Sequence, residues 1–194
     1  MRLLPRVTEP DFELVVRLHY AGLYRFALSL ARSEPDAADL TQQTFYLWAT
    51  RGHQLRDAGK LKSWLFTTLY REFLGRRRHA DRFPHVELSS VEDELPAAEP
   101  PEIRSLDAEA VMQGLQAVDE VFRAPLALFY LEDRSYQEIA AILGIPTGTV
   151  MSRLARGKQQ LRRLLNEAAA GTPGNLVRLE PRAPLPQPQA HHDP

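Results

Sequence analysis

The sequence contains no cysteine, which excludes several kinds of chemistry. A chain without thiols has no disulfide framework, no thiolate nucleophile and no cysteine-ligated zinc. No apolar run approaches the length of a membrane span, and residues 1–12 have no apolar core long enough for a signal peptide. We therefore expect a cytoplasmic protein with no membrane insertion.

A large net charge is also missing, because 24 Lys and Arg residues offset 25 Asp and Glu residues. A protein that coats DNA through its overall charge is excluded, so any affinity for nucleic acid has to come from segregated cations. The 44% apolar content can build real cores, and 194 residues suffice for one domain or two small ones.

Signs of catalysis are scarce as well. The chain has six histidines, but it shows no spaced metal-ligand set, no glycine-rich phosphate loop and no nucleophile motif. His191 and His192 form an isolated pair without nearby ligands, which favours an incidental pair. We expect no enzyme, no metal and no cofactor.

The most informative stretch is 135–165, which predicts two helices joined by a tight turn. Ser135 and Glu138 have the spacing of a capping box, and Gly144 supplies a left-handed residue that ends the first helix. Thr147 can cap a second helix, whose apolar stripe contains Val150, Leu154, Leu161 and Leu165, with Gly157 allowing close packing. Ala140, Gly144 and Val150 stand at the spacings that are typical of a DNA-binding helix-turn-helix.

The polar side of that second helix carries five cations and no acid between residues 146 and 165. A helix in the major groove reads base edges with its early residues and meets phosphates with the rest. The alternative is a solvated amphipathic helix whose arginines keep it soluble, but solvated helices usually mix charges of both signs. The base-reading candidates are Thr149, Met151, Ser152, Ala155 and Arg156, and the phosphate candidates are Arg153, Lys158, Arg162 and Arg163.

Three further helices are predicted in the first half of the chain. The first begins at Thr8 and runs to about Arg32, and the second begins after Ser33 and ends at Gly52. The third runs from about Leu61 to His79 and mixes aromatic residues with cations. This composition suits unpaired bases, which stack on rings while cations follow the phosphates; for any single aromatic residue, packing in the core is the competing interpretation.

The region from Phe83 to Asp107 is acidic and rich in proline, which is typical of a flexible linker between separate domains. Helix returns from Leu106 to Leu131, with a break expected near Pro125. The predicted fold is all-α, with two small helical domains at 8–83 and 106–169, a linker at 84–105, and a proline-rich disordered tail at 170–194.

The order of these elements resembles a bacterial RNA polymerase sigma factor of the sigma-70 family, and more narrowly the small extracytoplasmic-function (ECF) group. DAADLTQQTF (36–45) resembles the family's polymerase-docking helix, and KSWLFTTLYREFLGRRR (62–78) resembles its promoter-melting helix. The stretch from Tyr130 to Leu165 resembles the region that reads the −35 element. Each motif is moderately specific, and their combination in one chain is strongly so.

The resemblance implies a dissociable subunit that binds core RNA polymerase and promoter DNA, opens the DNA, and is controlled by an anti-sigma factor. It implies −35 contacts at Tyr136, Thr149, Ser152, Arg153, Arg156 and Lys158. The predicted −35 set is completed by the helix-face candidates Met151, Ala155, Arg162 and Arg163 named above. It implies −10 recognition and melting at Gln54, Lys60, Lys62, Ser63, Trp64, Tyr70, Arg71, Arg76, Arg77 and Arg78. It implies polymerase contacts at Asp39, Gln42, Gln43, Phe45 and Trp48.

A stand-alone helix-turn-helix repressor, binding operator DNA as a dimer, is the alternative. It would need a ligand-binding or dimerisation domain in the first half of the chain, where this sequence has a basic and aromatic helix.

Overall fold

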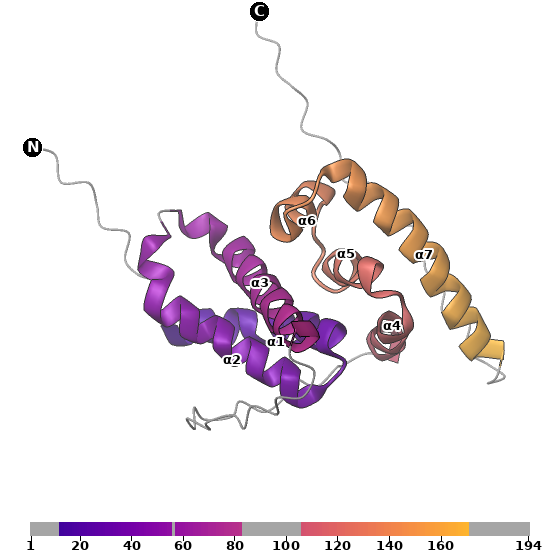
Figure 1. Ribbon diagram of the computed structural model, residues 1–194, viewed down its shortest axis with the longest axis horizontal. Helices are drawn as coiled ribbons and strands as arrows, with labels where there is room; N and C mark the ends of the chain where they lie inside the picture. Colours follow the sequence, from indigo (N-terminus) through magenta and orange to yellow (C-terminus); the bar gives the residue numbers. More distant parts are fainter. Residues whose placement is uncertain (1–11, 56, 83–105, 171–194) are drawn as a thin grey trace, which may run out of the picture.

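The computed structural model describes residues 12–55, 57–82 and 106–170, and these ranges contain helices and no strand (Figure 1). The first module consists of α1 (Phe12–Ala31), α2 (Glu34–Arg51) and α3 (Leu61–Arg82), with the 3-10 turns η1 (Gly52–Gln54) and η2 (Ala58–Lys60) before α3. The second module consists of α4 (Leu106–Ala117), α5 (Glu120–Tyr130), α6 (Tyr136–Leu143) and α7 (Thr147–Ala170). The prediction of an all-α fold is confirmed.

The first module forms around α1 and α2, which pack along each other, with α3 laid against both. The chain reverses between α1 and α2 at Arg32, which takes a left-handed φ of 62°, and at Ser33, whose hydroxyl accepts a hydrogen bond from the Asp36 amide at 3.5 Å. This is the helix start that the sequence predicted. The predicted cap at Thr8 lies outside the described residues.

The second module differs from the prediction at its first break. The sequence placed the break near Pro125, but α4 ends at Ala117 and α5 starts at Glu120, so Pro125 lies inside α5. The chain turns because Asp119 adopts an extended conformation, with ψ of 139°. Pro125 lacks only the one N–H that would bond four residues back, and it lies buried inside α5.

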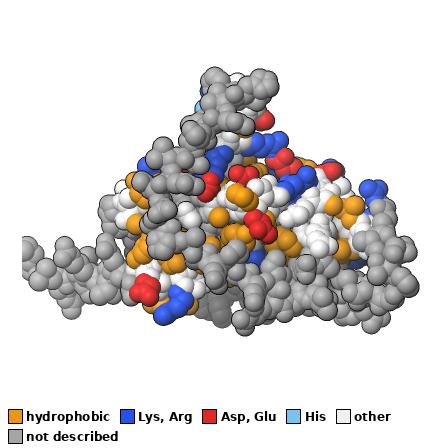
Figure 2. Space-filling model, turned by 90° about the horizontal axis from the view of Figure 1, so that it is seen from below, with side chains coloured by type: hydrophobic (Ala, Val, Ile, Leu, Met, Phe, Trp, Pro, Cys, Tyr) orange, Lys and Arg blue, Asp and Glu red, His pale blue; other side chains and the backbone are white. Residues whose placement is uncertain are grey.

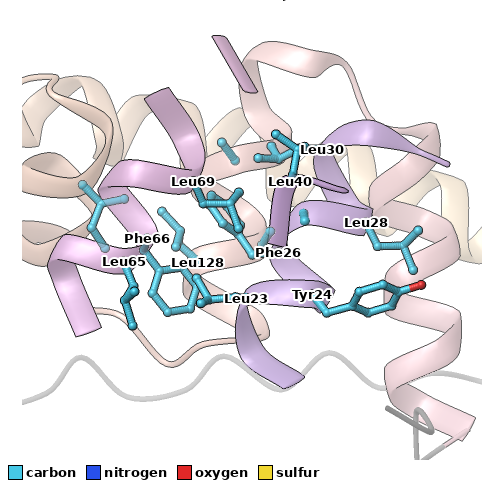
Figure 3. Packing of buried hydrophobic residues seen from close by; sticks show 14 of the residues in the cluster. Leu23, Tyr24, Phe26, Leu28, Leu30, Leu40, Leu65, Phe66, Leu69 and Leu128 are labelled. Atoms are coloured by element: carbon cyan, nitrogen blue, oxygen red, sulfur yellow. The ribbon is translucent and has the colours of Figure 1, made fainter. Parts of the chain in front are cut away.

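The two modules are in contact, which the interpretation of residues 83–107 as a linker between separate domains did not anticipate. Helix α5 packs on α1, and α6 packs on α3. Figure 3 shows Leu128 of α5 among Leu23 and Phe66 of the first module, and all three side chains are fully buried. The buried residues of both modules form one continuous hydrophobic cluster. The proposed linker and residues 171–194 of the proposed tail lie outside the described residues, whereas Ala170 is the last residue of α7.

Candidate nucleic-acid interface

Helices α6 and α7 form the helix-turn-helix that the sequence predicted. The Ser135 hydroxyl accepts a bond from the Glu138 amide at 3.3 Å, and the Glu138 carboxylate accepts one from the Ser135 amide at 2.9 Å. Burial alone would raise the pKa of Glu138, but the hydrogen bonds from Ser135 and Arg134 outweigh it and lower that pKa. Gly144 ends α6 with a φ of 66°. The capping box and the left-handed turn are confirmed.

Helix α7 begins one residue earlier than predicted. Thr147 is its first helical residue rather than its cap, and the Pro146 carbonyl accepts the first bonds, from the amides of Thr149 at 2.9 Å and Val150 at 3.1 Å. Proline fits here because its own missing N–H would have no partner at a helix start. The turn therefore sets the direction in which α7 leaves α6.

The inner face of α7 matches the predicted apolar stripe. Val150, Leu154 and Leu161 are buried. A Cβ at Gly157 would lie 2.9 Å from both Phe122 and Leu126 of α5, so glycine is required where the two helices cross. This close contact fixes the rotation of α7 and directs its opposite face to solvent.

The outer face of α7 presents most of the predicted −35 side chains to solvent. Met151 is exposed to 53%, and the Ser152 hydroxyl donates to the Thr149 carbonyl at 3.0 Å. The exposed members of the predicted set are Met151, Ser152, Ala155, Arg156, Arg162 and Arg163. Met151 to Arg156 lie on the first turns of α7, and Arg162 and Arg163 lie about two turns further along. In a helix that lies in the major groove, the early residues can reach base edges and the later cations can reach phosphates.

Two predicted −35 residues contact the protein itself. The Lys158 ammonium lies 4.2 Å from the centre of the Phe129 ring and 5.7 Å from that of Tyr130, and burial lowers its pKa. Arg153 is half-buried and lies near enough to Tyr70 of α3 to act on the pKa of that phenol, which burial raises. These two cations are less available to phosphate than the exposed ones.

The predicted melting residues on α3 lie on several faces of the helix. Trp64 packs edge-on against Trp48, with ring centres 5.6 Å apart, so this ring takes part in the core packing of the first module. Gln54, Lys60, Arg71, Arg76 and Arg78 are exposed, Lys62, Ser63 and Tyr70 are half-buried, and exposed Arg77 forms an ion pair with Glu120 of α5. On the molecular face shown in Figure 2, acidic and basic side chains lie close together between hydrophobic patches. That face is not a uniformly basic surface.

The predicted polymerase contacts on α2 separate into two groups. Phe45 and Trp48 are buried, so they pack the first module. Asp39 is exposed and lies 4.0 Å from Arg76 of α3, while Gln42 and Gln43 are half-buried. The polar members of the set are therefore the ones that a partner can reach.

Comparison with known proteins decides the family. Residues 15–83 match the model of sigma-70 region 2, and residues 108–161 match that of sigma-70 region 4. The chain is 32% identical over 164 residues to the ECF RNA polymerase sigma factor SigM of Mycobacterium tuberculosis, covering 82% of this chain and 80% of that protein. This chain belongs to the ECF RNA polymerase sigma factors. Such proteins direct RNA polymerase to promoters, and the match to both regions does not favour a repressor.

Other relatives agree with this assignment. The sigma factor is 35% identical over 167 residues to SigE of Mycolicibacterium smegmatis, and the match covers 84% of this chain and 65% of SigE. RpoE from Bartonella quintana, solved in complex with the anti-sigma factor NepR, has a TM-score of 0.63 and 30% identity over 80% of this chain and 97% of its own. CnrH, solved with the cytosolic domain of CnrY, shares the fold with a TM-score of 0.56.

The structure of the sigma factor also shows residues that sequence reasoning missed. Tyr46 on α2 is 55% exposed, one turn beyond Gln42, and the helical spacing alone could have indicated it. Arg123, Glu132 and Arg134 are charged side chains that lie largely out of solvent. Arg134 pairs locally with Glu138, whereas Glu132 pairs with Arg25 and Arg123 also bonds to Leu30, so only these last contacts come from distant parts of the sequence.

The described residues show neither a membrane span nor a metal site. They contain no helix long and apolar enough to cross a membrane. They also contain no group of three or more His, Asp or Glu side chains placed to hold a metal ion. His191 and His192 lie outside the described residues.

Proposed function

We propose that α7 of this sigma factor reads the −35 element, that α3 and the turns before it bind the unpaired −10 region, and that the polar face of α2 binds core RNA polymerase. The −35 assignment rests on the exposed cations and polar groups that Gly157 directs away from α5. The functional units are residues 8–83 and 106–169, joined by 84–105 and followed by a tail at 170–194. Nucleotide chemistry belongs to the polymerase, so the chain itself is not an enzyme, and it acts in the cytoplasm.

Control by an anti-sigma factor is part of the proposal. It is supported by the fold shared with RpoE, which was solved in complex with the anti-sigma factor NepR. Titration of the purified protein with candidate anti-sigma domains, followed by competition with core polymerase, tests it.

Arg156→Ala is expected to lose about 1–3 kcal/mol of discrimination between the correct and a substituted −35 base. Arg156 is exposed one turn beyond Ser152, with no hydrogen bond or ion pair recorded for its side chain among the described residues, so its guanidinium is available to a guanine edge. The measurement is competition binding of the polymerase holoenzyme to promoters that differ at single −35 positions.

Lys158→Ala is the matched comparison for Arg156→Ala. Its ammonium lies over the Phe129 ring rather than on the exposed face, so it does not reach a base edge and acts on DNA only through its charge. We therefore expect slightly weaker binding to all sequences alike and a slightly flatter salt dependence. Equal loss of base discrimination in the two variants would contradict the assignment of Arg156.

Replacing both Asp39 and Gln42 by alanine is expected to weaken binding to core polymerase by about tenfold, while the melting temperature stays within a few degrees. Both lie on one face of α2, and neither belongs to the buried cluster. Asp39 pairs with Arg76 only at 4.0 Å and in solvent, where such a pair contributes about 0–1 kcal/mol to stability.

Competition with a labelled sigma factor for core polymerase measures this affinity. The control is Thr50→Ala on the same helix, which removes an exposed hydroxyl that is bonded to Tyr46 within α2. A double variant that melts like the wild type and competes normally for core polymerase would refute the docking role.

A further inference from the structure

The contact between the two modules contains a buried carboxylate that nothing in the proposed function uses. Glu132 follows α5, and its side chain is only 5% exposed. Its Oε1 accepts a hydrogen bond from Arg25 of α1 at 2.9 Å, and its Oε2 lies 3.8 Å from the Lys62 ammonium of α3. One acidic side chain of the second module thus neutralises cations from two helices of the first.

Helix α1 is shaped to accept this carboxylate. A Cβ at Gly22 would lie 2.7 Å from Oε2 of Glu132 and 3.0 Å from Oε1. Any larger residue at position 22 would therefore displace the carboxylate from its place. Glycine is unfavourable in the middle of a helix, so its presence here fits the requirement for a close approach.

Cations from both modules lie around Glu132 at the seam where the modules meet, and one of them, Arg134, is itself paired with Glu138 at 2.7 Å. The Arg134 guanidinium lies 5.6 Å above the centre of the Phe66 ring of α3. Burial lowers the pKa of His19 on α1, and the neighbouring charges of Lys62 and Arg134 lower it further. Without the carboxylate, the cations on the two sides of the seam would repel one another.

The contact also leaves part of its polar surface without partners. Nε and Nη2 of Arg134 are buried and have no hydrogen-bond partner. Burying unpaired donors costs free energy that water would return if the modules separated. The contact therefore combines buried apolar side chains and a favourable ionic contact with an unfavourable burial of donors. The last of these is the part that separation of the modules would relieve, as a conformational switch requires.

We propose that Glu132 is a latch that holds the two modules together in an autoinhibited, closed state. In that state its carboxylate pairs with the Lys62 ammonium, which binds a DNA phosphate once the modules have separated. Glu120 acts in the same way on Arg77 of α3, with which it forms an ion pair. When the modules separate, DNA phosphates replace Glu132 and Glu120 as the partners of Lys62 and Arg77, and water reaches the Arg134 guanidinium. The role of Lys62 and Arg77 on DNA rests on the proposed function, whereas the latch itself rests only on the contact between the modules.

Fluorescence energy transfer between the modules tests the latch. The chain has no cysteine, so cysteines introduced at the exposed positions Ala49 of α2 and Gln159 of α7 carry the only labels. Glu132→Gln keeps the side-chain shape and removes the charge, and we expect the ratio of closed to open protein to fall about tenfold. Glu34→Gln, at an exposed position at the start of α2, makes the same change of net charge and should leave the transfer efficiency unchanged.

A pair of glycine variants tests the same latch without changing any charge. Gly22→Ala adds a methyl group against the Glu132 carboxylate and is expected to open the modules. Gly75→Ala adds the same methyl group to the interior of α3, where it meets nothing within 4 Å, and should leave them closed. Both changes raise helix propensity, so loss of energy transfer in Gly22→Ala cannot be attributed to a weaker helix. Unchanged transfer in both Glu132→Gln and Gly22→Ala would overturn the latch.

Binding of a labelled single-stranded DNA oligonucleotide, measured by anisotropy without polymerase, tests the occlusion of Lys62. Apparent affinity scales with the fraction of open protein, so Glu132→Gln is expected to bind at least about threefold more tightly than Glu34→Gln. Opening without any gain in affinity would overturn the autoinhibition. Adding Lys62→Ala to Glu132→Gln separates the two proposals: if the gain persists, the −10 role of Lys62 fails while the latch stands.

Discussion

Arg123→Ala is expected to lower the free energy of unfolding by about 3–5 kcal/mol, a large share of the total of a small protein. The Arg123 guanidinium is buried and donates to three carbonyl oxygens: Leu115 at 3.1 Å, Val118 at 2.9 Å and Leu30 at 3.3 Å. Burial lowers its pKa to about 10, so the side chain remains a cation at neutral pH. Alanine would leave the three carbonyls without this donor and open a cavity beside the end of α4.

Urea denaturation followed by far-ultraviolet circular dichroism measures this loss. Arg123→Lys keeps the charge but not the planar fork of donors, so an intermediate loss of about 1–2 kcal/mol is expected. Arg17→Ala, at an exposed position on α1, should change stability by no more than about 0.5 kcal/mol. A loss below about 1 kcal/mol for Arg123→Ala would show that water replaces these bonds.

The same variant reports whether the modules unfold together. Both tryptophans, Trp48 and Trp64, lie in the first module, whereas Arg123 lies in the second and bonds to Leu30 across the seam. If the two modules form one cooperative unit, the fluorescence midpoint shifts together with the circular dichroism midpoint.

The helix-turn-helix could be predicted from sequence because its determinants are local. Ser135 and Glu138 cap α6 within three residues of each other, and Gly144 needs only its own backbone freedom to end it. The buried stripe of α7 follows from helical periodicity alone. The exposed face of the candidate −35 site is then fixed as the opposite side of the same helix.

The contact between the modules could not be predicted because its determinants are far apart in the sequence. Arg25 and Glu132 are separated by 107 positions, and neither stands in a recognisable motif. The same limit explains why Phe45 and Trp48 were assigned to a partner although they are buried. Their apolar character fits either role, and only the packing of Phe45 on Tyr20 of α1 and of Trp48 on Trp64 of α3 shows that they are buried in this structure.

The free protein is expected to give no footprint that covers both promoter elements, and core polymerase should tighten binding to the paired elements by at least about a hundredfold. The resemblance to the sigma family implies elements about 17 base pairs apart, or roughly 58 Å along the duplex. In the structure α6 packs on both α3 and α7. The two candidate DNA-binding helices, α3 and α7, therefore cannot be separated by that span while the modules remain in contact.

The chain between the modules permits the separation but does not impose it. The 23 residues at 83–105 separate the end of α3 from the start of α4, and they reach about 76–83 Å when fully extended. The acidic residues of this segment are repelled by DNA, so the duplex cannot draw it out. Another body has to hold the modules apart, and core polymerase is the proposed partner that contacts the first module through α2.

Nuclease footprinting and permanganate reactivity, on one promoter fragment with and without core polymerase, test this expectation. Core polymerase should produce one continuous protected region with reactive, unpaired thymines at its downstream end. A protein that needs its partner to separate its two DNA-binding modules avoids occupying promoters on its own, because each module alone binds weakly. Tight and two-fold symmetric protection by the free protein would contradict this dependence, since symmetric binding requires a dimer that presents two copies of α7 at once.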